Sequence, residues 1–354
     1  MRDVYGMTGI STLLRRWERS SLAQITALKL SLPWRRSAKL LDAGDHIPQL
    51  FVGITSWNSE RFLPRCIRAI QASTNAQTTE IVVLDNASQD ASVKLARDLG
   101  AMVVVKPCNQ GEALNRLVSL SRARYTLLIH ADVIMLSPNW FALCRSKITD
   151  RSVLVAPEDV GCGPLTRPFG AEKPESSFLF FLTSVLKDLR SIRWQGRRWV
   201  KVPRRRIDFY TGVTHNIPSE LAKRGLSWFK MDVHWSEHVS KPIYTPDVRP
   251  MFWSSELAYL RYGLGNFYSI DGIITHYHNW YDRVQWPKAK RKEFPPQYID
   301  AYTAAFLNDY DRGQLAIPPA IKSDRKPVAL WVDDKAEASR TLSVDSRAGR
   351  LAPK

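Results

Sequence analysis

The sequence predicts an α/β fold, in which a Rossmann-like, mostly parallel sheet is flanked by helices. Between residues 49 and 150, apolar runs of strand length alternate with segments whose apolar residues recur at helical spacing. The apolar runs lack the polar–apolar alternation of a half-exposed strand, so both of their faces should be buried. A buried strand followed each time by a helix is typical of parallel pairing with helices on both faces of the sheet.

The expected elements follow one another in a regular order. We expect strands at 50–57, 80–88, 101–107 and 125–132, and helices at 59–73, 90–100, 111–123 and 138–148. Gly100 closes the second helix, since glycine is favoured just past a helix end. The element after residue 124 ends in Asp132, and a Ser137-Pro138 turn then starts the next element.

The pattern weakens after residue 150. Residues 153–159 predict one more strand, and the apolar run FLFFLTSVL at 178–186 favours a core helix. We therefore divide the chain into four parts: a basic amphipathic segment (1–46), a half with strand–helix alternation (47–150), a half with a weaker pattern (151–312) and a tail expected to be partly disordered (313–354).

The chain is strongly basic, with a formal net charge of +17 over 354 residues. Such a balance favours an anionic partner, although a basic surface can also serve solubility alone. Residues 187–206 carry nine Lys and Arg against one Asp. This run suits an anionic lipid surface, a lipid-diphosphate ligand, or a loop that is solvated or lines a ligand site. We expect no nucleic acid partner, because no recognised nucleic-acid-binding module accompanies the run.

Residues 1–46 place leucines and a tryptophan at roughly helical spacing among arginines and lysines. A helix of this kind can lie on an anionic membrane or pack on the protein itself, and both alternatives stay open. The four cysteines form no CxxC pair, and no apolar run approaches the roughly 18–20 residues that span a bilayer. No secretory signal is apparent, so we expect a cytoplasmic protein, free or peripheral on the inner face of the plasma membrane.

Polar side chains follow each expected strand. Ligands of open parallel sheets bind beyond the carboxyl ends of the strands, so these side chains should share one edge. Asp85 follows the second strand and Asp132 ends the fourth. Each alone is also a good turn residue. Their joint placement on one edge favours a site in which one carboxylate accepts hydrogen bonds and the other holds a divalent cation on phosphate oxygens.

Three quoted stretches carry a specific resemblance. GITSWNSERFLPRCIRAIQAS, EIVVLDNASQDAS and NQGEALNRLVSLSRARYTLLIHAD occur in this order between residues 53 and 132. They resemble the opening strand and helix, the Asp-x-x-Ser-x-Asp turn and the Asn-x-Gly helix with its Asp-x-Asp strand of family 2 glycosyltransferases. Residues 50–145 are therefore similar to the nucleotide-binding half of that family, which has the glycosyltransferase-A fold.

The resemblance implies a role for each matching residue. The donor-site residues it implies are Ser56 and Trp57 in the base pocket, Asp85 on the base, Asn109, Gly111 and Asn115 near the sugar and diphosphate, and His130 beside the metal. Asp132 would bind the metal–diphosphate, with Mn²⁺ or Mg²⁺ as cofactor. The donor would be a nucleotide diphosphate sugar.

One position departs from the family pattern, since His130 replaces the first acid of Asp-x-Asp. A neutral imidazole can bind Mn²⁺, so the site can work unchanged. The other outcomes are weak or metal-free donor binding, or a non-catalytic relative.

The second half should bind the acceptor. Residues 250–283 resemble the family's acidic helix, a strand and a histidine that closes the metal site; they also resemble peptide- and hydroxyproline-type N-acetylglucosaminyltransferases. Glu256 is the expected general base that deprotonates the acceptor hydroxyl, with Asp232 and Glu237 as rivals. Each could instead be an acid on a helix face or a salt-bridge partner.

His276 and His278 lie two residues apart on a strand-like run, so their side chains should point the same way. We expect one of them as a further metal ligand; the alternative is a buried, hydrogen-bonded histidine.

These expectations combine into a metal-dependent glycosyltransferase that acts on a saccharide or lipid-linked saccharide acceptor, with inversion favoured and retention left open. The expected class of acceptor rests on analogy with the family. A nucleotidyltransferase is the first rival, but GITSWNSERF lacks the Gly-rich, Lys/Arg-bearing loop that such enzymes need after the first strand. A non-catalytic saccharide- or membrane-binding protein is the second.

Overall fold

The computed structural model describes residues 48–159, 165–166, 173–188, 197–202, 205–210, 213–241, 259–263, 265–279, 296–317 and 328–329. The amphipathic segment 1–46, Glu256 and most of the tail lie outside these residues. The chain divides into two compact units, one of residues 1–131 with 180–194 and the other of residues 132–179 with 195–354.

The first unit holds a parallel sheet with helices on both faces. Its strands are β1 (Leu50–Ser56), β2 (Thr79–Asp85), β3 (Met102–Val105) and β4 (Tyr125–His130), and its helices include α3 (Leu63–Ser73), α4 (Ser92–Asp98) and α5 (Gln110–Leu120). The strand order is β3-β2-β1-β4, and the pairs β1–β2, β1–β4 and β2–β3 are parallel. The predicted α/β fold is confirmed.

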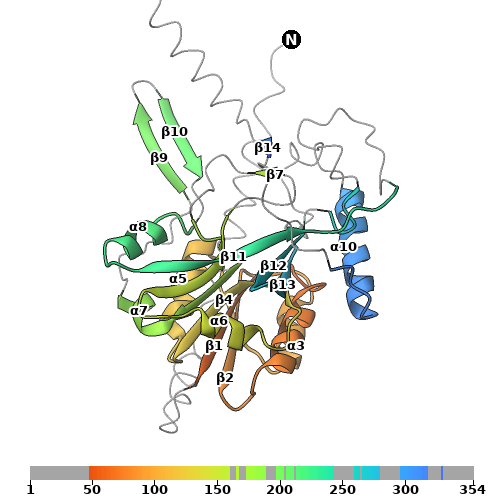
Figure 1. The fold of residues 1–354 in the computed structure, drawn as a ribbon, viewed down its shortest axis with the longest axis horizontal. Coiled ribbons are helices and arrows are strands. Elements are labelled where there is room, and N and C mark those ends of the chain that lie inside the picture. The colour runs from red at the N-terminus through yellow and green to blue at the C-terminus, as the bar shows by residue number, and fades with distance from the viewer. Residues whose placement is uncertain are drawn as a thin grey trace, which may run out of the picture. The chain divides into compact units, whose positions relative to one another are not determined.

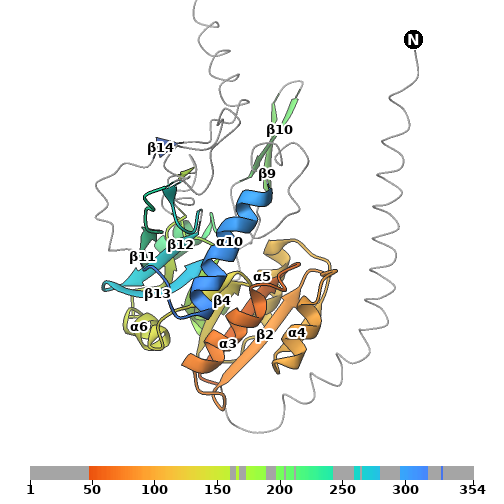
Figure 2. The same cartoon turned by 90° about the vertical axis from the view of Figure 1, so that its right-hand side faces the viewer.

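The helices of this unit follow from the strand order. The chain steps from β1 to β2 to β3 in one direction and returns past β1 to β4, so right-handed crossovers put α3 and α4 on one face and α5 on the other. Figures 1 and 2 show this arrangement. Because both faces are covered, every residue of β1 is buried, which explains the missing polar–apolar alternation.

The second unit holds a mixed sheet. Its strands include β5 (Val133–Met135), β6 (Ser152–Pro157), β11 (Ser227–Trp235), β12 (Asn266–Ile270) and β13 (Ile273–His278). Their order is β6-β11-β12-β13-β5, with β6–β11 parallel and the other pairs antiparallel. The helices described here are α6 (Trp140–Ser146), α8 (Ile217–Ala222) and α10 (Pro296–Asp311). Two small sheets pair β9 (Arg197–Val202) with β10 (Arg205–Tyr210), and β7 (Leu165–Thr166) with β14 (Val328–Ala329).

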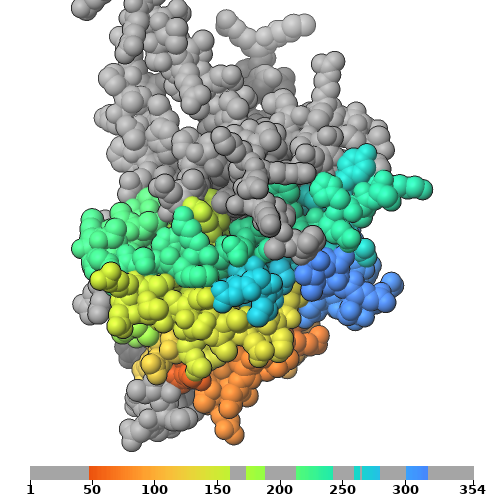
Figure 3. All heavy atoms as spheres, viewed as in Figure 1, coloured from red at the N-terminus to blue at the C-terminus, as the bar shows by residue number. Residues whose placement is uncertain are grey.

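Helix α10 packs on the hairpin β12–β13 through aromatic side chains. Phe306 stacks on Tyr277 with 3.6 Å between ring centroids and meets Tyr262 edge-on at 5.4 Å. In Figure 3 the helix (blue) and the hairpin (cyan) form a continuous surface. Gly265 allows this approach, because a Cβ there would lie 1.9 Å from the Tyr277 hydroxyl oxygen.

Replacing Gly265 by alanine should destabilise the fold by about 2 kcal/mol, because the added methyl group must push the Tyr277 ring off Phe306. Gly272→Ala is the matched comparison: its Cβ meets nothing within 4 Å, and its φ of +77° alone costs about 1 kcal/mol. Urea unfolding of both variants measures the difference. An equal or smaller loss for Gly265→Ala would refute this packing.

Two expectations about the elements were wrong. Residues 178–186 form a strand, β8 (Phe178–Leu182), before the short helix α7 (Thr183–Asp188). The four residues Phe178 to Phe181 are all buried, and such a doubly covered aromatic run favours a strand over a helix. The strand β5 directly after Asp132 was also missed. Among the described residues, no helix has the length and apolarity needed to cross a membrane.

Candidate active site

The carboxyl ends of β1, β2 and β4 lie in register. Ser56 is opposite Asp85, and Thr55 is opposite His130. The backbone N–H of Ala131 donates to the carbonyl of Thr55 at 3.0 Å, which ties the chain after β4 to β1. The structure therefore brings the expected strand-end residues of the first unit to one edge.

Asp85 organises the loops at this edge. It is fully buried, and its two oxygens accept hydrogen bonds from the backbone N–H and the hydroxyl of Ser88, each at 2.7 Å. The Ser88 hydroxyl in turn accepts a hydrogen bond from the backbone N–H of Asn58. The side-chain oxygen of Asn58 accepts a hydrogen bond from the backbone N–H of Gln89. The Asp-x-x-Ser turn thus fastens the loop after β1 to the loop after β2. A direct contact of Asp85 with a base stays a prediction.

The other expected donor-site residues of the first unit have different surroundings. Ser56 is buried, and its hydroxyl has no hydrogen-bond partner among the described residues. Asn109 caps α5, because its side-chain oxygen accepts a hydrogen bond from the backbone N–H of Glu112 at 3.0 Å. Gly111 is buried in the first turn of α5, while Asn115 is exposed and Trp57 half-buried.

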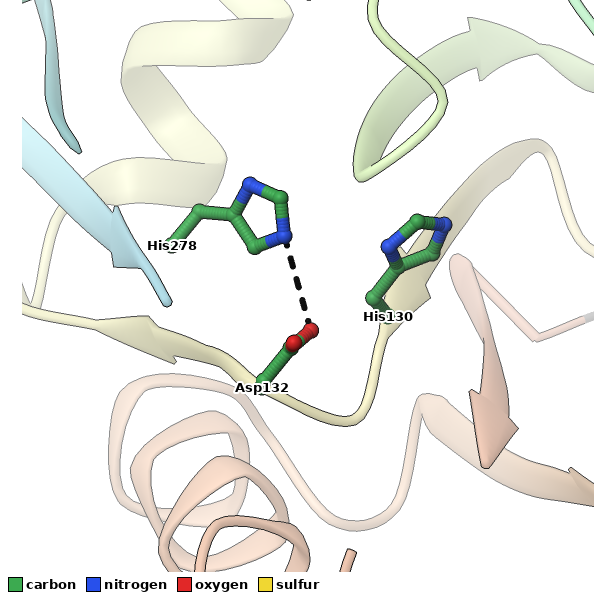
Figure 4. A group of neighbouring side chains, drawn as sticks. All are labelled: His130, Asp132 and His278. Atoms are coloured by element: carbon green, nitrogen blue, oxygen red, sulfur yellow. Dashed lines mark ion pairs between the residues drawn. The ribbon is translucent and has the colours of Figure 1, made fainter. Parts of the chain in front are cut away.

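In the second unit, the side chains of Asp132 and His278 lie close together. Asp132 is 6% exposed, and its Oδ1 lies 3.5 Å from Nε2 of His278. The backbone N–H of Asn279 donates to the carbonyl of Asp132 at 3.0 Å and fixes β13 beside it. His130, two residues before Asp132 in the chain, completes a group whose ligand atoms all lie within 4.8 Å of one another (Figure 4). Nε2 of His130 also lies 2.5 Å from the side-chain nitrogen of Gln110.

Glu175 is a site residue that the sequence reasoning missed. Its Oε1 lies 2.8 Å from Nδ1 of His278, on the opposite side of the ring from Asp132. Next to it, Lys173 pairs with Asp159, and all of these side chains are buried. Two buried carboxylates, those of Asp132 and Glu175, therefore flank the histidine. The only sequence signal was an acid three residues before the apolar run that starts at Phe178, and it belongs to no motif.

The two carboxylates hold His278 as a cation in the metal-free protein. Burial alone would lower its pKa, but Asp132 and Glu175 more than offset burial and raise the pKa to about 9. This location therefore favours positive charge, which a bound metal ion would also supply.

The raised pKa of His278 predicts how stability changes with pH. Its pKa lies above the ordinary value of 6.5, so its contribution is full below pH 6.5 and is lost as the pH rises through about 9. The loss should be on the order of 3 kcal/mol. Urea unfolding in EDTA from pH 6 to 10 measures it, and His278→Asn should show a flatter profile. Equal slopes for both proteins would contradict the assignment.

His276 lies outside the group formed by His130, Asp132 and His278. Its ring is stacked between the rings of Phe178 and Tyr268, with 4.2 Å and 4.7 Å between ring centroids. Burial, and to a lesser degree the charge on His278, lowers its pKa well below the ordinary value, so His276 is neutral. The Thr275 hydroxyl donates to the Tyr268 carbonyl and lies 3.0 Å from Nδ1 of His276. This environment fits a core histidine better than a metal ligand.

The three candidate general bases are the remaining acids. Asp232 and Glu237 are exposed, and Glu256 is outside the described residues.

The group formed by His130, Asp132 and His278 fits a divalent metal. It offers one carboxylate and two imidazoles, and Asp132 Oδ1 is buried. Two nitrogen donors suit Mn²⁺ better than Mg²⁺, which prefers oxygen ligands.

The region that carries the strand-end residues is similar to a known protein family. The model described as "Glycosyl transferase family 2" matches residues 51–200. Residues 51–200 are therefore similar to family 2 glycosyltransferases. The match confirms the resemblance of residues 50–145. It ends before residues 250–283, so the second resemblance, to N-acetylglucosaminyltransferases, stays a prediction.

Solved structures similar to this chain cover part of it. TarS 1-349 from S. aureus shares 16% identity at a TM-score of 0.33, over 42% of this chain and 50% of that one. Glucosyl-3-phosphoglycerate synthase from Mycobacterium tuberculosis, in complex with Mn²⁺, UDP and phosphoglyceric acid, shares 19% identity at a TM-score of 0.34, over 39% of this chain and 57% of that one. The chain thus spans little more than half the length of these structures. No curated protein sequence matches the chain.

Proposed function

We propose that the protein is a metal-dependent glycosyltransferase that moves a sugar from a nucleotide diphosphate sugar to a hydroxyl acceptor. The observation that carries the proposal is the buried Asp132, which follows the carboxyl end of β4 and approaches His278. In open parallel sheets this edge is where nucleotide ligands bind. The family 2 match over residues 51–200 supports the same class of reaction.

His130, Asp132 and His278 would hold Mn²⁺ or Mg²⁺. When bound, the metal offsets negative charge on the diphosphate leaving group. The pairing of Ser56 with Asp85 supports a donor site at this edge, with the nucleotide between the loops after β1 and β2. The unpartnered, buried hydroxyl of Ser56 is a hydrogen-bonding group that a ligand could use.

Glu256 is the proposed general base that takes the proton from the acceptor hydroxyl, and Asp232 and Glu237 are the alternatives. Both alternatives are exposed, so an acceptor can reach them. Direct displacement by the activated hydroxyl would invert the anomeric centre.

The acceptor we propose is a saccharide or lipid-linked saccharide of cell-surface polysaccharide synthesis. The net charge of +17 and the basic run at 187–206 support an anionic acceptor or an anionic membrane on the inner face of the plasma membrane. Part of that run forms the hairpin of β9 and β10.

The test is the release of nucleoside diphosphate from a panel of nucleotide sugars, with and without Mn²⁺. At least one donor should be cleaved in the presence of Mn²⁺. Asp132→Ala should lose this activity, and Asp98→Ala, an exposed acid of α4 paired with Lys94, should keep it. If no donor is cleaved or bound under either condition, the enzyme proposal fails in favour of a non-catalytic relative. Cleavage unaffected by Asp132→Ala would leave the activity but overturn the site.

A further inference from the structure

We infer that Glu175 is a positioning residue that orients the His278 ring so that its Nε2 atom faces the metal site. The inference rests on the proposed function, because it assumes that His278 is a metal ligand. It assigns a role to a residue that no motif in the sequence identifies.

Glu175 is held at both of its carboxylate oxygens. Oε1 lies 2.8 Å from Nδ1 of His278 and accepts a hydrogen bond from the hydroxyl of Ser177. Oε2 accepts from the hydroxyl of Tyr268 at 2.7 Å. Glu175 is 4% exposed, and His278, Tyr268 and Ser177 are also buried. The carboxylate therefore has a fixed position.

The backbone around Glu175 is fixed as well. The N–H of Glu175 donates to the carbonyl of Pro157 at 2.8 Å, and the N–H of Asp159 donates to the carbonyl of Lys173 at 2.9 Å. The buried ion pair of Lys173 with Asp159 joins the same two segments through their side chains. Residues 173–175 are thus an extended segment paired with the end of β6, which is a rigid support for a side chain that orients another.

This geometry decides which nitrogen of His278 is available to a metal. A carboxylate only accepts hydrogen bonds, so Nδ1 of His278 must carry the proton that faces Glu175. In a neutral ring the lone pair is then on Nε2, the atom 3.5 Å from Asp132. Histidine ligands of metals commonly donate their other N–H to a carboxylate in this way, and loss of that partner costs about 10- to 100-fold in metal affinity.

The same contacts argue against Glu175 as the general base. A base needs a free oxygen within reach of the acceptor hydroxyl. Both oxygens of Glu175 accept hydrogen bonds from buried side chains, and one of them also faces the His278 ring. Its effect on the reaction would pass through His278.

The test is the dissociation constant of Mn²⁺ for the full chain, measured by electron paramagnetic resonance without any donor or turnover. Glu175→Met keeps the length of the side chain but has no acceptor oxygen, and we expect the Mn²⁺ dissociation constant to rise about 10- to 100-fold. Glu175→Gln keeps an oxygen that can accept from Nδ1, so its dissociation constant should rise about threefold at most. Circular dichroism and the melting temperature report whether each variant is folded.

The outcomes separate this inference from the proposed function. If the unmodified protein binds no Mn²⁺, the metal site itself fails. If it binds Mn²⁺, His278→Ala weakens binding and Glu175→Met does not, the positioning role is overturned while the site stands. Equal weakening by Glu175→Met and Glu175→Gln would also overturn it, because the hydrogen bond would then not be the cause. Should Glu175→Met fail to fold, Tyr268→Phe decides: a raised dissociation constant supports the role, and an unchanged one contradicts it.

Discussion

Replacing Asp132 by asparagine should lower the rate of donor cleavage about a thousandfold, because the metal's stabilisation of the leaving group is worth several kcal/mol. Asparagine keeps the shape of the side chain and removes only its charge. The change also takes away one of the two carboxylates that face His278. The measurement is kcat/KM for the cleaved donor over a range of Mn²⁺ concentrations.

Asp98→Asn is the control for this variant, because Asp98 is an exposed acid at the end of α4 and pairs only with Lys94 among the contacts described. It should keep the rate of the unmodified protein. A rate within tenfold of normal for Asp132→Asn would mean that Asp132 does not hold the metal, whatever the donor turns out to be.

Replacing His130 by aspartate should shift the metal preference of the enzyme toward Mg²⁺. The change converts the group from two imidazoles and one carboxylate to one imidazole and two carboxylates, and Mg²⁺ prefers oxygen ligands. We expect the ratio of the Mn²⁺-supported rate to the Mg²⁺-supported rate to fall about tenfold or more. The measurement is the rate of donor cleavage at saturating concentrations of each metal.

His130→Ala separates this effect from simple removal of the histidine. It should lower the rate with both metals and leave their ratio closer to that of the unmodified protein. If His130→Asp and the unmodified protein show the same preference, His130 does not contact the metal. Its contact with Gln110 would then have a structural role.

The first unit could be predicted from the sequence because its signals are local. Buried strands such as β1 are continuous apolar runs, and helices such as α3 bury Leu63, Cys66, Ile67 and Ile70 at helical spacing. Once the strand order is given, right-handed crossovers decide which face each helix covers, and the parallel pairing of β1 with β2 puts Ser56 beside Asp85.

The features that were missed depend on contacts between distant parts of the chain. The run at 178–182 has the apolar content of a helix or a strand, and its burial by distant parts of the chain decides for β8. Glu175 faces His278 across more than a hundred residues of sequence, so no spacing rule could connect them. The sequence places His276 and His278 on one face of a strand, but it could not tell that Phe178 and Tyr268 enclose the first and two carboxylates enclose the second.

The most direct test of the account is the binding of nucleoside diphosphates to the full chain, measured by isothermal titration calorimetry with and without Mn²⁺. We expect that at least one nucleoside diphosphate binds, that Mn²⁺ strengthens its binding, and that Asp132→Asn removes the effect of Mn²⁺. If no nucleoside diphosphate binds with or without Mn²⁺, the edge formed by β1, β2 and β4 is not a donor site and the account is wrong.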